Sequence, residues 1–198
     1  MGRLKALPPS RLDAEQRALF DAITTSKRSQ GRPLEDFLLE DGGLRGPFNA
    51  WLHAPKIGQP AQRLGEAVRY ESRLPPRLRE LAVLTVSARW RADYEWWAHS
   101  RIARSVGLGD ETITALKSEE LPSAAEPEEL AVHRLAIELM DNHRVNDEVY
   151  REAVARLGEP GVVELITLLG YYTLVSMILN TFQVAIPEGE TPPFSATL

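Results

Sequence analysis

The amino-acid sequence predicts an all-α fold. Apolar residues recur at helical spacing in successive segments, as at Leu78, Leu81 and Leu84, and prolines and glycines separate these segments. No stretch of useful length alternates between apolar and polar residues, and no segment repeats. A chain of 198 residues with 43% hydrophobic content is long enough for one well-filled core. We therefore expect a single all-α domain over residues 1–198.

The expected helices follow one another almost without interruption. An opening helix places Leu19 and Ile23 on one stripe. Further helices are expected at residues 60–72, 75–90, 92–106, from Asp110, at 128–143 and at 146–158, followed by a long apolar helix that starts at Pro160. That last helix is apolar on all sides, so we expect it to be covered on all sides, in the bundle or in a subunit interface. Residues 186–194, "IPEGETPPF", are expected to be extended.

Residues 38–60 are expected to form a long irregular connection. The segment is rich in glycine and proline, yet it also carries Phe48, Trp51 and Ile57, which makes it too apolar for a solvated linker. A loop with its own aromatic residues more often lines or covers a site than merely joins two helices. His53, between these aromatic residues, fits a packed loop histidine better than a catalytic one.

Composition excludes several classes of function. The net charge of −5 and the scattered arginines argue against a nucleic-acid partner. The absence of cysteine removes thiolate catalysis, disulfides and cysteine-based metal sites. The first residues, "MGRLKALPPS", lack the apolar core of a signal peptide, which predicts a cytoplasmic protein. The apolar helix has the length of a membrane span, but Glu164, Asn180 and the lack of flanking Lys or Arg argue against membrane insertion.

The segment "RADYEWWAHS", residues 91–100, contains the best candidate for a site. Glu95 and His99 lie one helical turn apart, on a face of the 92–106 helix that is otherwise mostly apolar. A buried carboxylate needs a partner or a polar cavity. One hypothesis is a structural hydrogen bond inside a bundle, and another is a histidine acid–base group oriented by a carboxylate. A metal site is disfavoured, because no other histidine has a suitable ligand spacing.

Four stretches together resemble a known family. They read "GPFNAWLHAPKIG", "LGEAVRYES", "LPPRLRELAVLTVSARW" and "ADYEWWAHSRIARSVGL". In this order they resemble the carboxymuconolactone decarboxylase family, which includes the alkylhydroperoxidase AhpD. The resemblance implies an AhpD-like helical bundle, with residues 46–140 as its core, that assembles into homo-oligomers through its long helices.

The resemblance also implies site positions. AhpD-like members carry a glutamate followed by Cys-x-x-Cys-x-x-x-His, and this pattern falls on Glu80, Ala92, Glu95 and His99 without a gap. Ala92 and Glu95 supply no thiol, so peroxide reduction is excluded. The decarboxylase branch, which lacks the cysteine pair and shows Glu-x-x-x-His, resembles this chain better.

We therefore expect a cofactor-independent decarboxylase or related lyase that acts on a small carboxylated lactone or similar acid. The expected catalytic residues are His99 as proton donor, Glu95 as its orienting carboxylate, and Glu80 as a second carboxylate. For Glu80, a surface ion pair with Arg77 or Arg79 is the alternative. The expected substrate-binding residues are Arg91, Trp51, Phe48 and Trp96, with no metal and no cofactor. The alternative function is a non-catalytic small-molecule-binding or assembly protein of the same fold.

Overall fold

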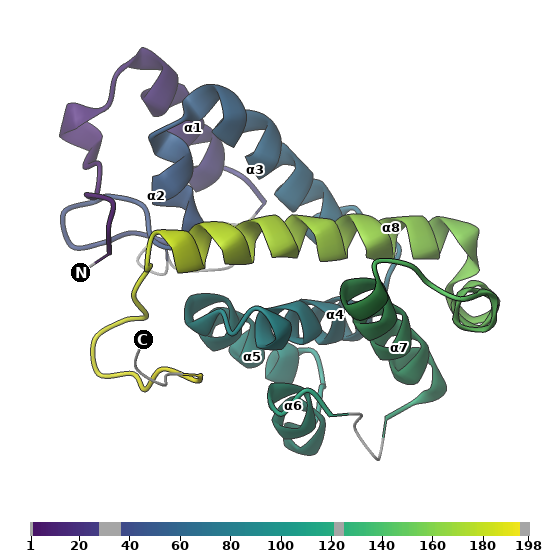
Figure 1. The fold of residues 1–198 in the computed structure, drawn as a ribbon. Coiled ribbons are helices and arrows are strands. Elements are labelled where there is room, and N and C mark those ends of the chain that lie inside the picture. The colour runs from purple at the N-terminus through teal and green to yellow at the C-terminus, as the bar shows by residue number, and fades with distance from the viewer. Residues whose placement is uncertain (1, 28–36, 121–124, 195–198) are drawn as a thin grey trace. The chain divides into compact units, whose positions relative to one another are not determined.

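A computed structural model describes residues 2–27, 37–120 and 125–194. Within these residues the chain forms eight α-helices and a short 3-10 helix, and the only β-type pairing is one isolated bridge between Leu38 and Leu44 (Figure 1). The all-α prediction is confirmed. The chain divides into two compact units, Met1–Glu71 with Ile178–Ala185, and Ser72–Met177 with Ile186–Leu198. The prediction of a single domain over residues 1–198 stays a prediction.

The first unit contains three helices, α1 (Ala14–Thr24), α2 (Pro47–Leu52) and α3 (Pro55–Tyr70). Helix α1 starts with a capping box, in which the Asp13 carboxylate accepts from the Gln16 N–H and the Gln16 side chain accepts from the Asp13 N–H. A side-chain carbon at Gly58 would lie 2.7 Å from atoms of Leu19 and of Trp51, so glycine permits close packing there.

The expectation of an irregular connection over residues 38–60 is wrong. Residues 47–52 form α2, and α3 already begins at Pro55. Pro47 and Pro55 each occupy the first turn of a helix, where the missing N–H and the fixed φ of proline are tolerated. The two prolines thus start helices that we had assigned to a loop.

The second unit is organised around α4 (Pro76–Arg89), which packs against α5 (Asp93–Ser105), α6 (Asp110–Lys117) and α7 (Pro127–Asn142). Residues 80–88 of α4 are all buried. A helix that neighbours cover on every side buries its polar side chains too. This is why Glu80 lies inside the unit and not on its surface.

Helix α8 (Asp147–Thr181) consists of two helical segments. Asn146 caps the first segment, because its side-chain oxygen accepts from the N–H groups of Glu148 and Val149. Gly158, with φ 68° and ψ 163°, separates the segments, and Pro160 lies just after it. The predicted helix end at Gly158 and the new start at Pro160 are therefore confirmed.

The apolar part of α8 is covered on one side only within this chain. Leu165, Leu168 and Val175 are buried, whereas Val163 and Met177 are 65% and 46% exposed. The expectation of coverage on all sides therefore fails for the single chain. By length and composition alone α8 is long and apolar enough to cross a membrane, and half of its most apolar window is buried within the chain.

Candidate active site

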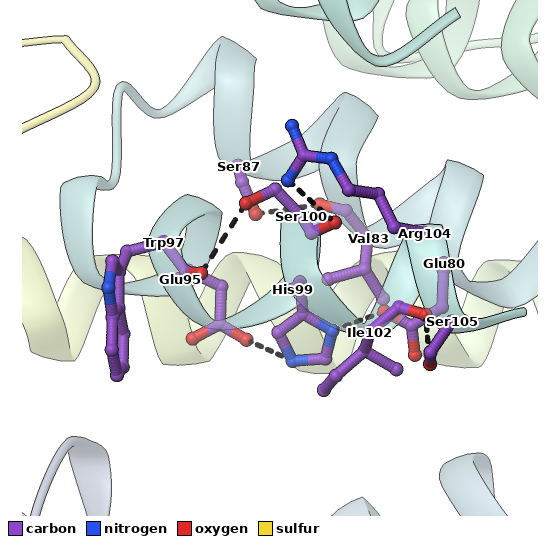
Figure 2. Close-up of polar contacts among 10 residues, drawn as sticks. All are labelled: Glu80, Val83, Ser87, Glu95, Trp97, His99, Ser100, Ile102, Arg104 and Ser105. Carbon is purple, nitrogen blue, oxygen red and sulfur yellow. Dashed lines mark hydrogen bonds and ion pairs between the residues drawn. The ribbon is translucent and has the colours of Figure 1, made fainter. Parts of the chain in front are cut away.

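A glutamate, a histidine and a second glutamate meet between α4 and α5. The Nδ1 atom of His99 lies 2.6 Å from Oε2 of Glu80, and its Nε2 atom lies 3.1 Å from Oε1 of Glu95. Figure 2 shows the two carboxylates on opposite sides of the imidazole ring. Helix α5 contributes Glu95 and His99 one turn apart, and the neighbouring α4 contributes Glu80. We call these three residues the Glu–His–Glu cluster.

The cluster is buried. The side chains of Glu80, Glu95 and His99 are 7%, 5% and 6% exposed, respectively. The alternative of a surface ion pair for Glu80 is wrong, since its side chain is buried and contacts His99. Both glutamates predicted from the sequence thus contact the histidine.

The pKa of His99 is raised above its ordinary value. Burial by itself lowers this pKa, but the charges of Glu80 and Glu95, together with their hydrogen bonds, raise it by more. An imidazolium at His99 donates one N–H to each carboxylate. With both carboxylates ionised, the three side chains carry one excess negative charge. Both neighbouring carboxylates therefore favour the protonated form of the imidazole.

Tyr172 of α8 covers the imidazole ring. Its ring centroid lies 5.1 Å from that of His99 with the planes at 81°, and Tyr171 packs edge-on against Tyr172 at 5.3 Å. Both tyrosines are at most 4% exposed. The sequence reasoning did not include Tyr172 in the site. The only available signal was a pair of tyrosines in an otherwise aliphatic helix.

The predicted substrate-binding residues lie in two places. Arg91 is exposed, and its guanidinium donates to the Phe194 carbonyl at 2.7 Å. Trp96 is buried and packs edge-on against the Phe194 ring at 5.2 Å. Phe48 and Trp51 belong to the first unit, where their rings contact each other at 5.6 Å. The roles assigned to these four residues stay predictions.

The cluster does not have the arrangement of a metal site. Each ring nitrogen of His99 lies within hydrogen-bond distance of a carboxylate oxygen. Across the described part of the chain, no group of three or more His, Cys, Asp and Glu side chains is arranged to hold a metal ion.

Residues 55–138 match the carboxymuconolactone decarboxylase family. The match covers this segment of the chain and not the regions on either side of it. The matched residues include the whole Glu–His–Glu cluster but neither Tyr172 nor Phe194. The sequence matches none of the curated proteins. The resemblance inferred from the sequence is confirmed by this match, which supports an enzyme-like role.

Solved structures confirm the AhpD-like fold. An alkylhydroperoxidase AhpD core, an uncharacterized peroxidase-related protein from Ralstonia eutropha JMP134, matches with a TM-score of 0.74 at 15% identity, over 94% of this chain and 93% of that chain. The debrominase Bmp8, as a cysteine-to-alanine variant in complex with 2,3,4-tribromopyrrole, matches with a TM-score of 0.68 at 14% identity, over 95% of this chain and 91% of that chain. At these identities the similarity establishes the fold alone.

A further match is to a protein of unknown function from Agrobacterium tumefaciens, a candidate antioxidant defence protein AhpD. Its TM-score is 0.65 at 16% identity, over 72% of this chain and 99% of that chain. Thiol chemistry is not available to the present chain, which contains no cysteine.

A second buried histidine predicts sensitivity to acid. His133 of α7 is 3% exposed, burial lowers its pKa, and neither ring nitrogen has a hydrogen-bond partner among the described residues. Its share of the stability is present above the unfolded-state pKa of about 6.5 and is lost as the pH falls below it. We expect His133→Leu to reduce the loss of unfolding free energy between about pH 7 and about pH 5, measured by urea denaturation.

The range between about pH 7 and about pH 5 distinguishes the contribution of His133 to stability from that of His99. His99 has a raised pKa, so its contribution is fully present below about pH 6.5 and does not fall with acid. The control is His143→Asn, because His143 is exposed and has a left-handed backbone that asparagine tolerates. If His133→Leu lost as much unfolding free energy on acidification as the wild type, His133 would not be the cause of the acid sensitivity.

Proposed function

We propose that this protein is a cofactor-independent decarboxylase or related lyase that acts on a small carboxylated lactone or similar organic acid. The observation that carries this proposal is the buried histidine with a raised pKa between two carboxylates. Such a group keeps a proton near neutral pH and delivers it in a site from which water is largely excluded.

The reaction is a replacement of a carboxylate by a proton. The bond between the substrate carbon and its carboxylate breaks, carbon dioxide leaves, and the electron pair moves onto a conjugated carbonyl as a dienolate. The His99 imidazolium then donates its proton to that carbon, and the imidazole is protonated again from solvent. Loss of carbon dioxide leaves the negative charge on the substrate as the dienolate, and proton transfer from His99 neutralises it.

The two carboxylates have different roles in this proposal. Proton delivery requires one hydrogen bond of His99 to open, and the bond from Nε2 to Glu95, at 3.1 Å, is longer than the 2.6 Å contact between Nδ1 and Glu80. Glu80 therefore orients the ring, and Nε2 faces the substrate beside Glu95. This reverses the order of importance that the sequence indicated for the two glutamates.

Solvent deuterium tests the proposed reaction. The protein is incubated in heavy water with a panel of small lactone carboxylic acids, and carbon dioxide release and product are followed by NMR. We expect one acid to be converted, with one deuterium at the carbon that loses its carboxylate, because the donated proton exchanges with solvent.

The alternative is a non-catalytic binding protein, and one observation favours it. The cluster is almost fully buried and its histidine is satisfied by internal partners, as in a purely structural network. In that case an acid of the panel raises the melting temperature but is recovered unchanged. Binding without conversion across the panel would overturn the decarboxylase proposal.

We also propose that the protein assembles into a homo-oligomer through α8. Its exposed apolar residues recur at helical spacing on one face, and they are Val163, Ile166, Leu174 and Met177. Gly170 lies on the same face, and no atom lies within 4 Å of the position of an added Cβ. A second copy of the chain would cover this stripe, and the small residue would permit close helix packing.

A charge on this face is expected to prevent assembly. Leu174→Glu places a carboxylate in the proposed contact, so we expect multi-angle light scattering to show a monomer for this variant and an oligomer for the wild type at micromolar concentration. Thr114→Glu, an exposed position on α6, is the matched control and should keep the wild-type mass. A wild-type monomer would rule out the proposed assembly.

A further inference from the structure

Phe194 is bound by the start of α5 through its main chain. Its N–H donates to Oδ1 of Asp93 at 2.8 Å, and its carbonyl accepts from the Arg91 guanidinium at 2.7 Å. Both main-chain polar groups of Phe194 are thus hydrogen-bonded to side chains at the start of α5, those of Arg91 and Asp93. Main-chain contacts of this kind recognise an extended peptide whatever its side chains are.

The Phe194 side chain is bound at the same place. The Trp96 ring packs edge-on against it with centroids 5.2 Å apart, and the Arg91 guanidinium lies 5.6 Å from the Phe194 centroid. A phenylalanine ring gains from an edge-to-face contact with another aromatic ring and from a cation over its face. These contacts add selectivity for the side chain to the recognition of the main chain. We call Arg91, Asp93 and Trp96 the Phe194 socket.

A second attachment lies further along α5. Arg101 pairs with Glu190, and its guanidinium stacks on the Trp97 ring at 4.5 Å. Asp93 and Arg101 are separated by eight residues of helix, which corresponds to roughly 12 Å. Glu190 and Phe194 are separated by four residues with a bend at positions 193 and 194, and four residues reach at most roughly 13 Å. The segment therefore runs antiparallel to α5 in a register that matches both attachments.

The socket includes a strained backbone. Arg91 joins α4 to α5 with φ 47°, a left-handed conformation that is unfavourable for a residue with a side chain. Such a conformation persists where surrounding contacts hold it. The Arg91 N–H donates to the Ala88 carbonyl, and its side chain is held by Phe194. The bound segment thus holds the turn from which the helix of Glu95 and His99 begins.

We propose that the Phe194 socket is a docking site for a peptide with phenylalanine after two prolines, and that the chain's own segment, residues 186–194, is its ligand. The docked segment braces the turn at Arg91 and the first turn of α5. This function is separate from the reaction, because it requires neither a substrate nor proton transfer.

A peptide-exchange experiment tests the docking site. The probe is a fluorescein-labelled synthetic peptide with the sequence of residues 186–198, added to full-length protein and followed by fluorescence anisotropy. We expect at least about tenfold tighter binding to Phe194→Ala than to the wild type, because the variant's own segment no longer competes. Thr191→Ala, an exposed residue of the same segment, is the matched control and should behave as the wild type.

A second substitution locates the probe. Adding Asp93→Ala to Phe194→Ala removes the acceptor of the main-chain N–H and should abolish the gain in binding. Hydrogen exchange followed by mass spectrometry should show protection of residues 186–194 in the wild type and loss of that protection in Phe194→Ala. Equal and rapid exchange in both proteins, or equal probe binding with and without Asp93, would overturn the proposal. Circular dichroism confirms that each variant is folded.

Discussion

Replacement of His99 by glutamine is expected to lower turnover of the true substrate by at least about a hundredfold, the usual minimum for loss of a general acid. Glutamine hydrogen-bonds to a carboxylate but does not deliver a proton near neutral pH. The effect should appear in kcat with little change in KM, because the proton is needed in the transition state and not for binding. Steady-state kinetics on the acid found with the substrate panel would measure it.

Stability has to be separated from chemistry in this experiment, because His99→Gln also removes the cation between two buried carboxylates. We expect it to lower the unfolding free energy by roughly 1–3 kcal/mol. Glu129→Gln is the matched control, since Glu129 is also buried and charge-paired, with Arg77, but lies outside the cluster. The control should lose comparable stability and keep its turnover. Near-normal turnover in folded His99→Gln would make His99 structural.

Replacement of Glu80 by glutamine is expected to lower the pKa of His99. The amide oxygen still accepts from Nδ1, but the charge of Glu80, the largest of the influences that raise this pKa, is gone. Loss of a charge-assisted buried hydrogen bond should also lower the unfolding free energy by about 2 kcal/mol. NMR titration of the His99 C2 proton would measure the pKa, with the resonance assigned from its absence in His99→Gln.

The same substitution changes how stability depends on pH. In the wild type the contribution of His99 is fully present below about pH 6.5 and is lost as the pH rises through its raised pKa. In Glu80→Gln this loss should begin at lower pH, and the basic limb of any turnover profile should move with it. Glu148→Gln, an exposed residue on α8, is the control. An unchanged His99 pKa in Glu80→Gln would show that Glu80 does not hold the proton in place.

Most helices were predictable from the sequence because the signals that define them are local. Helical periodicity identified the segments from α4 to α8, and Gly158 with Pro160 marked the break inside the last one. The error at residues 38–60 has a local cause as well. Dense prolines and glycines indicate a loop, yet Pro47 and Pro55 start helices, and the sequence alone did not separate these two uses of proline.

The site was predictable to the extent that it lies on one helix. Glu95 and His99 are four residues apart, so their contact follows from helix geometry alone. Glu80 lies on a different helix, and its position against His99 was implied only by the family resemblance, with a surface ion pair as the alternative. Packing of α5 against α4 decided that question, because contacts between helices depend on distances that local periodicity does not contain.

The sequence by itself therefore determined the fold class, the family and the absence of thiol chemistry, all of which depend on composition, periodicity and motif spacing. Three contacts were decided only by the tertiary structure. Glu80 makes the shorter contact to His99, Tyr172 covers the His99 ring, and Phe194 contacts Arg91 and Trp96. In each case the partners are at least 19 positions apart in the chain. Burial of apolar surface brings such residues together, and this force acts on the whole unit and not on any short segment.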